Sequence, residues 1–335
     1  VSVEESGIHQ LTYEQLQAMG MANPAAVRIY GNGASFLPEQ FSQGHIDDLE
    51  ALPLYLHKGS DDIFGPGDHI LFYAQGPVQW NFDEENGMYL HKRHCYSWKG
   101  YYFLTDSQGE ANVPDDAILS GASPTHMVNS YDFHDFHEDE SYNLINSGRT
   151  WYGDLFSVNL SEDYPFFMEG RVEDEPVKIH VVAAARSGQS STFAVSANNE
   201  QLGSISINGT NLSHYTSTYA YESSEKFTYQ SAWDEVDVTV SYLRPDANSM
   251  GWLNSISING RSELTITGSQ LAFRDSRSAG SGNISRFSLS QADSDILIWE
   301  VSDPGQPRNI SYDLEGSVAS FTIETFGHRE FIAFR

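Results

Sequence analysis

Alternating apolar and polar residues dominate the chain beyond Trp151. Val177, Ile179, Val181 and Ala183 would all point to one side of an extended segment. Similar segments recur about every ten residues, separated by Gly, Asn, Asp and Ser. This spacing predicts a β-sandwich, and a jelly roll is the topology that we expect.

The first 20 residues contain the clearest helix signal. Thr12 can cap a helix, and Gln15 three residues later completes a capping box. Leu16 and Met19 would share one face, and Gly20 is a typical residue at a helix end.

Short strands are expected after this helix. The apolar runs at Ala26–Tyr30, Pro53–Leu56 and Tyr101–Leu104 each predict one. His69–Ala74 is continuously apolar, which predicts a strand buried on both faces. Asp47–Leu52 predicts one short helical turn.

Two further stretches differ in character. Asp106–Asn146 is polar, acidic and weakly periodic, so we expect a long excursion there. The last 60 or so residues, from Arg274 onward, alternate again. Phe331–Arg335 has the pattern of an interrupted strand, so we expect the natural chain to continue past it.

One short sequence occurs twice. Ser204–Gly209 and Ser255–Gly260 both read Ser-Ile-Ser-Ile-Asn-Gly. Each copy predicts two inward-facing isoleucines followed by an Asn-Gly turn. Two copies do not indicate a repeat architecture, which needs at least three stacked units.

These patterns predict a mainly β protein. We expect an N-terminal α+β domain over residues 1–150 and a jelly-roll-like β-sandwich domain over 151–275. Residues 276–335 form further strands that pack on one of the first two, because so short a stretch makes a marginal core alone.

Charge excludes several functions. The 335 residues contain 46 Asp and Glu against 18 Lys and Arg, a net charge of −28. This argues against binding to nucleic acid or to an anionic membrane surface. The chain contains no apolar run of transmembrane length, and its first ten residues have no basic or apolar signal region, so we expect that a signal peptide either never existed or has been removed. One cysteine, Cys95, excludes an intrachain disulfide.

Cys95 is also the only candidate thiol nucleophile. Its neighbour His94 would point to the opposite face of a strand, so it is poorly placed to act as a base. We therefore expect Cys95 to have no catalytic role.

The sequence offers two kinds of candidate metal site, one with histidine ligands and one with carboxylate ligands. His134 and His137 would share a face on a helix, amid five acidic residues, but no third ligand follows at a known spacing. The acidic loops at Asp61–Asp62 and Asp293–Asp295 make calcium a candidate ligand, although neither has EF-hand spacing. We assign no metal ligand.

Aromatic residues leave a carbohydrate-binding alternative open. Trp151, Tyr152 or Trp252 could stack on sugars if exposed, although burial in the core is commoner for such residues. Nucleotide-binding loops and a nucleophile elbow are absent. The residues alone therefore indicate a non-catalytic β-rich module.

Four segments, in the same order, resemble a known family. Gly65–Tyr73, Ser97–Leu104 and Ile298–Pro304 each resemble one of its elements. His137–Phe156 is the most specific: it reads His-Glu-Asp-Glu and then Ser-Gly-Arg-Thr-Trp-Tyr-Gly, close to the family's His-Glu-x-Asp and Ser-Gly-Arg-x-Trp-Tyr-Gly. The family is the PorU-like sortases of the Bacteroidetes type IX secretion system, which are gingipain-type cysteine peptidases.

The resemblance covers only the region that precedes the peptidase domain in that family. It implies no catalytic residue here, and Cys95 stands where the family usually has Asn. It also implies an exported protein at the outer membrane surface whose partners are its own peptidase domain, secretion-system components or cargo proteins. Within the motif we expect Gly148 and Gly153 to permit turns, and Trp151 and Phe156 to anchor the sandwich.

Overall fold

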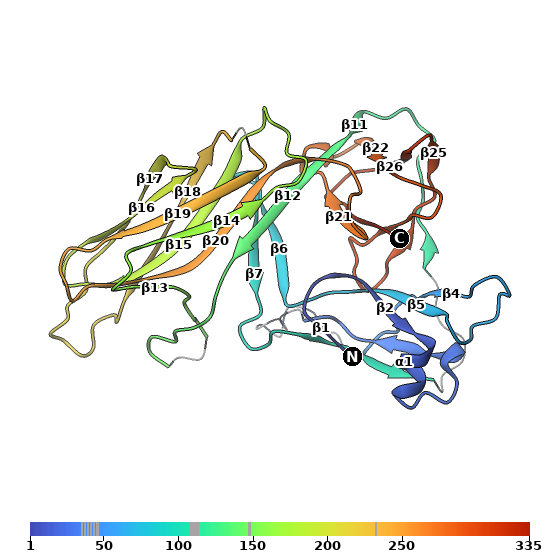
Figure 1. The fold of residues 1–335 in the computed structure, drawn as a ribbon, viewed down its shortest axis with the longest axis horizontal. Helices are drawn as coiled ribbons and strands as arrows, with labels where there is room; N and C mark the ends of the chain where they lie inside the picture. Colours follow the sequence, from blue (N-terminus) through green and yellow to red (C-terminus); the bar gives the residue numbers. More distant parts are fainter. Residues whose placement is uncertain are drawn as a thin grey trace. The chain divides into compact units, whose positions relative to one another are not determined.

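The computed structural model describes residues 1–34, 36, 38, 40, 42, 44, 47–106, 114–146, 149–231 and 233–335. It is mainly β, as predicted (Figure 1). The chain forms two compact units. The first comprises Val1–Gln79, Lys92–Tyr131 and Leu264–Arg335, and the second comprises Trp80–His91 and Asp132–Glu263.

This interleaving differs from the consecutive ranges expected from the sequence, which were two domains followed by C-terminal strands that pack on one of them. The reason is strand pairing between distant segments. Asp115–Asp116 pairs with Arg308–Asn309, and His126–Val128 pairs with residues 285–287. Residues 114–131 therefore belong to the same unit as the C-terminal strands.

The second unit is built on two sheets: a five-stranded sheet that contains the order β12-β20-β15-β18, and a four-stranded sheet with the order β14-β19-β16-β17. A short strand, β13 (Leu155–Phe156), also pairs with β20. The strand order of the two sheets is that of a jelly roll, which confirms the expected topology. Their bounds are β12 (Ser130–His137), β14 (Ser161–Phe167), β15 (Val177–Arg186), β16 (Ser191–Ala197), β17 (Glu200–Ile207), β18 (Tyr221–Tyr229), β19 (Glu235–Leu243) and β20 (Met250–Glu263).

Alternation along these strands builds the core of the sandwich. Val177, Ile179, Val181 and Ala183 are fully buried, whereas the residues between them are partly exposed. Phe156 is fully buried as well, as expected from the motif. Burial of each large apolar side chain contributes about 1.5–3 kcal/mol.

The duplicated hexapeptide behaves differently in its two copies. All four of its isoleucines are buried, as predicted. Strand β17 ends at Ile207, just before the first Asn-Gly pair. Strand β20 runs through Asn259 and Gly260 to Glu263, so the second predicted turn is wrong.

Tertiary contacts explain why β20 continues. The Asn259 side-chain amide accepts a hydrogen bond from the Tyr89 N–H at 2.6 Å and donates one to the Tyr89 carbonyl at 2.8 Å. A Cβ atom at Gly260 would lie 2.5 Å from the Met168 sulfur. Asn259 therefore bonds a neighbouring strand, and Gly260 makes room for the core.

We expect Gly260→Ala to destabilise the protein by about 1–3 kcal/mol, because the added methyl group overpacks the core around Met168. Thermal and urea unfolding would measure this effect. The control is Gly188→Ala in the same unit, where the new Cβ would meet the exposed Leu212 at an ordinary 3.4 Å. Equal stability of the two variants would contradict the packing argument.

The hairpin of β6 (Val78–Asp83) and β7 (Met88–Arg93) contributes residues 80–91 to the second unit. The His91 ring lies 3.0 Å from the Glu138 carboxylate and 2.8 Å from the Ser257 hydroxyl. Lys226 donates to Asp83 at 2.7 Å. These polar contacts hold the hairpin against the sheet β12-β20-β15-β18.

His180 is a pH-sensitive group beneath this hairpin. Burial, followed by the charges of Lys226 and His91, lowers its pKa from 6.5 to about 4, against the opposing effect of Asp83. The folded protein therefore holds a neutral His180 at pH values where the unfolded chain would bind a proton.

We expect stability to fall as the pH drops from about 6.5 toward 4, because only the unfolded state then gains the His180 proton. His180→Gln should flatten this part of the stability profile while leaving the acid loss below pH 4 in place. Urea unfolding at half-unit pH steps measures it. An unchanged slope in the variant would contradict the assignment.

The first unit contains a second pair of sheets around its own core. Their orders are β10-β24-β23-β27-β21 and β11-β22-β26-β25. Their bounds are β10 (Asp115–Asp116), β11 (His126–Val128), β21 (Gln270–Arg274), β22 (Ile284–Ser290), β23 (Leu297–Glu300), β24 (Arg308–Asn309), β25 (Asp313–Glu315), β26 (Val318–Glu324) and β27 (Glu330–Phe334). The expected excursion at 106–146 thus supplies edge strands to this unit and β12 to the jelly roll.

The N-terminal part of the first unit holds three small sheets, β2-β5-β4, β3-β9 and β1-β8. Its elements are β1 (Ser2–Val3), β2 (Gly7–Thr12), α1 (Tyr13–Ala18), η1 (Pro24–Ala26), β3 (Arg28–Tyr30), β4 (Tyr55–His57), β5 (His69–Ala74), β8 (Gly100–Tyr101) and β9 (Phe103–Thr105); a second 3-10 turn, η2 (Ser276–Ser278), follows β21.

Several N-terminal predictions are confirmed. Helix α1 carries the complete Thr12–Gln15 capping box. Strand β5 is buried on both faces: Ile70 and Phe72 enter one core, and Leu71 and Tyr73 enter another with Trp299.

One N-terminal prediction is wrong, because residues 47–52 form no helical turn. Ala51 instead bridges to Tyr30 at the end of β3. The expected turn glycine Gly148 lies outside the described residues.

Candidate functional site

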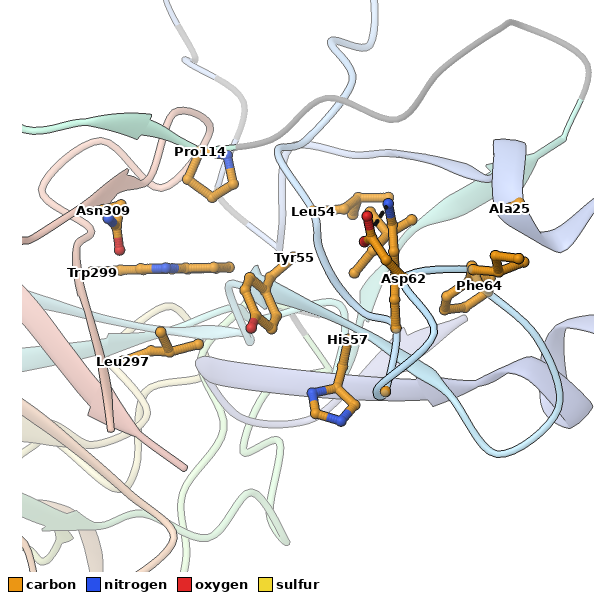
Figure 2. A pocket seen from close by; sticks show the side chains of 14 residues that line it. Ala25, Leu54, Tyr55, His57, Asp62, Phe64, Pro114, Leu297, Trp299 and Asn309 are labelled. Carbon is orange, nitrogen blue, oxygen red and sulfur yellow. Dashed lines mark ion pairs between the residues drawn. The ribbon is translucent and has the colours of Figure 1, made fainter. Parts of the chain in front are cut away.

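A groove in the first unit lies beside strand β4 (Figure 2). It encloses about 1050 Å³. Tyr55 and His57 line it from β4, while Leu297 and Trp299 line it from β23. Ile63, on the loop after β4, adds an apolar side chain that is 70% exposed.

The local sequence shapes this groove. Gly59 and Asp62 adopt positive φ angles of 58° and 57°, which turn the chain after the three-residue strand β4. Lys58 and Asp62 form an exposed ion pair at 3.4 Å across the turn. Trp299 is fixed in the wall by an edge-to-face contact with Phe334, with ring centres 5.1 Å apart.

The groove suits an extended polypeptide. Strand β4 lies at the edge of its sheet, and within the described part of the chain no further strand pairs with its outer side. Such an edge can accept another strand through backbone hydrogen bonds, while neighbouring apolar walls hold alternate side chains. The His57 ring stacks on the His69 ring, with ring centres 4.6 Å apart, and this contact holds His57 in the wall of the groove.

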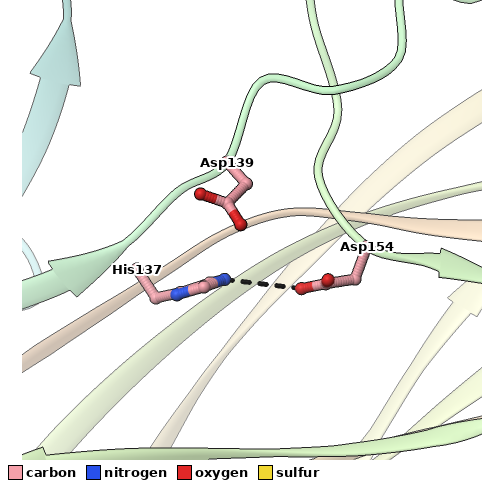
Figure 3. A group of neighbouring side chains, drawn as sticks. All are labelled: His137, Asp139 and Asp154. Carbon is pink, nitrogen blue, oxygen red and sulfur yellow. Dashed lines mark ion pairs between the residues drawn. The ribbon is translucent and has the colours of Figure 1, made fainter.

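A second candidate site lies at the rim of the jelly roll and combines His137, Asp139 and Asp154 (Figure 3). One nitrogen or oxygen from each side chain lies within 4.8 Å of the others. His137 Nε2 is 3.4 Å from Asp154 Oδ2. An adjoining pocket of about 340 Å³ is lined by Asp135 and Glu162, among others.

Backbone pairing brings these three residues together. Tyr142 and Tyr152 form an antiparallel bridge, which folds Asp139 back toward Asp154. The Leu253 N–H donates a hydrogen bond to the Asp154 carbonyl at 3.0 Å, and this fixes the backbone at Asp154. Between them Gly153 allows a close approach, because a Cβ there would lie 3.1 Å from the Asp139 carbonyl oxygen.

Tyr164 organises the same cluster. Its hydroxyl donates to Asp154 Oδ2 at 2.8 Å, and its ring lies 4.6 Å from the His137 ring. Burial, together with the hydrogen bond to Asp154, raises the pKa of Tyr164, so its hydroxyl remains a donor. Burial also raises the pKa of Asp135 in the adjoining pocket.

The two histidines weighed in the sequence do not act together. Both lie on strand β12, where residues three apart point to opposite faces. His134 packs against Trp80 at 4.3 Å and bonds the Asp132 carbonyl. His137 alone joins the cluster.

Asp139 and Asp154 were not assigned as ligands from the sequence. Both lie in His137–Phe156, the segment with the most specific resemblance. That segment was the available signal, but the Tyr142–Tyr152 bridge that completes the cluster could not be read from spacing.

His94 and Cys95, the pair considered from the sequence as base and thiol nucleophile, do not bond each other in the described structure. His94 stacks on Phe36 at 4.5 Å and accepts the Tyr96 N–H at Nδ1. Among the described residues, Cys95 makes no hydrogen bond to a histidine.

The acidic loops proposed for calcium also have partners. Asp62 pairs with Lys58, while Asp293 accepts hydrogen bonds from Arg335 and from the Asp295 N–H. The calcium assignment stays a prediction.

The aromatic residues considered for sugar binding differ in exposure. Trp252 is 3% exposed and cannot serve as an open stacking platform. Trp151 and Tyr152 are half-buried.

Comparison with known proteins finds a solved structure with a similar fold. The chain matches no protein-family model and no curated protein. It superposes on the crystal structure of dimeric latent PorU from Porphyromonas gingivalis with a TM-score of 0.84 and 22% identity, over 99% of this chain and 31% of that one. The fold is PorU-like.

The chain thus spans about a third of that PorU chain. A weaker match is the CBM36-1 domain of a multidomain xylanase from the hindgut metagenome of Trinervitermes trinervoides, with a TM-score of 0.26 and 9% identity over 39% of this chain. We draw no argument from so low a score. In the part of the chain that the structure describes, the helices are too short and too polar to span a bilayer.

Proposed function

We propose that this chain is the non-catalytic accessory region of a PorU-like cell-surface protein, in which it precedes a cysteine-peptidase domain. The observation that carries the proposal is the superposition of nearly the whole chain on about a third of PorU. The four resembling segments, found along the whole chain, support it independently. The protein would be exported, and it would help to process the C-terminal sorting signals of secreted cargo.

The surroundings of Cys95 support the non-catalytic part of this proposal. A thiol nucleophile needs a base within hydrogen-bonding reach, held in place by a third group. His94 is instead engaged with Phe36 and the Tyr96 N–H.

The natural gene provides the direct test. We expect its reading frame to continue past Arg335 into a domain with its own His and Cys. The 335-residue chain should not hydrolyse casein or fluorogenic peptides, because among the described residues no histidine bonds Cys95 to act as its base. Cys95→Ser in the full-length protein should leave peptidase activity unchanged.

Two results would contradict this function. One is a reading frame that ends at Arg335. The other is peptide hydrolysis by the 335-residue chain that Cys95→Ser abolishes.

We assign the groove beside β4 as the partner-binding surface of this region. Its edge strand and its apolar walls from Tyr55, Leu297 and Trp299 suit an extended segment of a protein partner. The net charge of −28 favours approach of a segment that carries basic residues.

Peptides selected from a phage-displayed random library on the purified chain should be extended and rich in apolar and basic residues. Ile63→Asp should weaken their binding at least about tenfold, because it places a carboxylate in an apolar wall. Fluorescence anisotropy measures the affinity. The matched control is Ile118→Asp, since Ile118 is 84% exposed and does not line the groove.

Equal affinity of the selected peptides for the Ile63→Asp and Ile118→Asp variants would rule out the groove as the binding surface. Both positions are exposed, so neither variant should unfold the protein.

A further inference from the structure

We propose that His137, Asp139 and Asp154 bind a single Zn²⁺ ion at the rim of the jelly roll. The site goes beyond the accessory function proposed above and does not depend on it.

The distances suit a tetrahedral ion. Zinc binds imidazole nitrogen and carboxylate oxygen at about 2.1 Å, so two ligands of a tetrahedral site lie about 3.4 Å apart. His137 Nε2 and Asp154 Oδ2 are separated by 3.4 Å. The third ligand atom, from the exposed Asp139, lies within 4.8 Å of both, so this carboxylate would have to move closer to bind the same ion.

The His137 nitrogen points to a ligand. Nε2 is shielded from solvent and, among the described residues, makes no hydrogen bond, although it lies near Asp154. The 3.4 Å contact with Asp154 is not a hydrogen bond, and Asp154 Oδ2 already accepts the Tyr164 hydroxyl. A buried polar atom without a partner is costly, and a metal bond would satisfy it.

The ligands are held in position without the ion. Tyr164 orients the Asp154 carboxylate through its hydroxyl and flanks the His137 ring. Gly153 allows the backbone of Asp139 to approach the segment that contains Asp154. Such outer contacts fix the orientation of metal ligands in known sites.

The pocket beside the cluster leaves room for a fourth ligand. Its volume of about 340 Å³ can hold water, and Asp135, Glu162 and Asp163 give it a negative charge that attracts cations. One imidazole with two carboxylates suits zinc better than calcium, which prefers oxygen ligands throughout. The competing arrangement is a metal-free ion pair between protonated His137 and Asp154.

Isothermal titration of chelator-treated protein with ZnCl₂ at pH 7 tests the proposal. We expect one site of micromolar affinity or tighter. His137→Ala and Asp154→Asn should each weaken it at least about 100-fold, and Tyr164→Phe about tenfold through loss of the orienting hydroxyl. The control is Glu200→Gln, which removes an exposed carboxylate of the same unit that does not line the pocket, so its affinity should stay within about twofold of wild type.

Circular dichroism at 25 °C checks that each variant is folded before titration. A zinc-soaked crystal should show an anomalous peak between His137 and the two aspartates. Three results would overturn the proposal: no zinc binding by the folded wild-type protein, binding that survives His137→Ala, or equal loss of affinity in Glu200→Gln. A calcium titration with the same affinity and no dependence on His137 would also overturn it.

Discussion

The structure depends on the burial of alternate side chains between paired sheets. Strand β12 shows how this constraint also creates a polar site. Phe133 packs on the jelly-roll core, and Asp135 and His137 follow at every second position on the same face. Because β12 extends beyond the apolar core, the same alternation that places Phe133 in the core places Asp135 and His137 in a small acidic pocket at the rim.

Features set by local chemistry could be predicted from the sequence. The capping box at Thr12 needs only residues three apart, and the alternation over Val177–Ala183 needs only a strand with one buried face. The continuous apolar run at His69–Ala74 likewise indicated burial on both faces, since no polar side was available for solvent. Because these signals arise within a few residues of chain, they gave the fold class and the jelly roll.

Features set by distant partners could not be predicted in this way. Asn259 has the sequence of a turn residue, but its amide bonds the backbone of Tyr89, 170 residues away. Ala51 pairs with Tyr30 and forms no helix. Asp139 and Asp154 come together only because Tyr142 pairs with Tyr152, and the spacing of residues in the sequence does not predict such a contact. In each case tertiary pairing overrides the local preference.

Fold and function depend on different parts of this chain. At 22% identity, what is shared with PorU is the scaffold of strands, and a scaffold alone does not specify a ligand. The two proposed binding sites lie where the scaffold is interrupted: at β4, whose three residues leave a sheet edge beside a groove, and at the loop between β12 and β13, which closes the cluster around Asp154. Substitutions at these two places can therefore change what the protein binds while the sheets that define its fold remain intact.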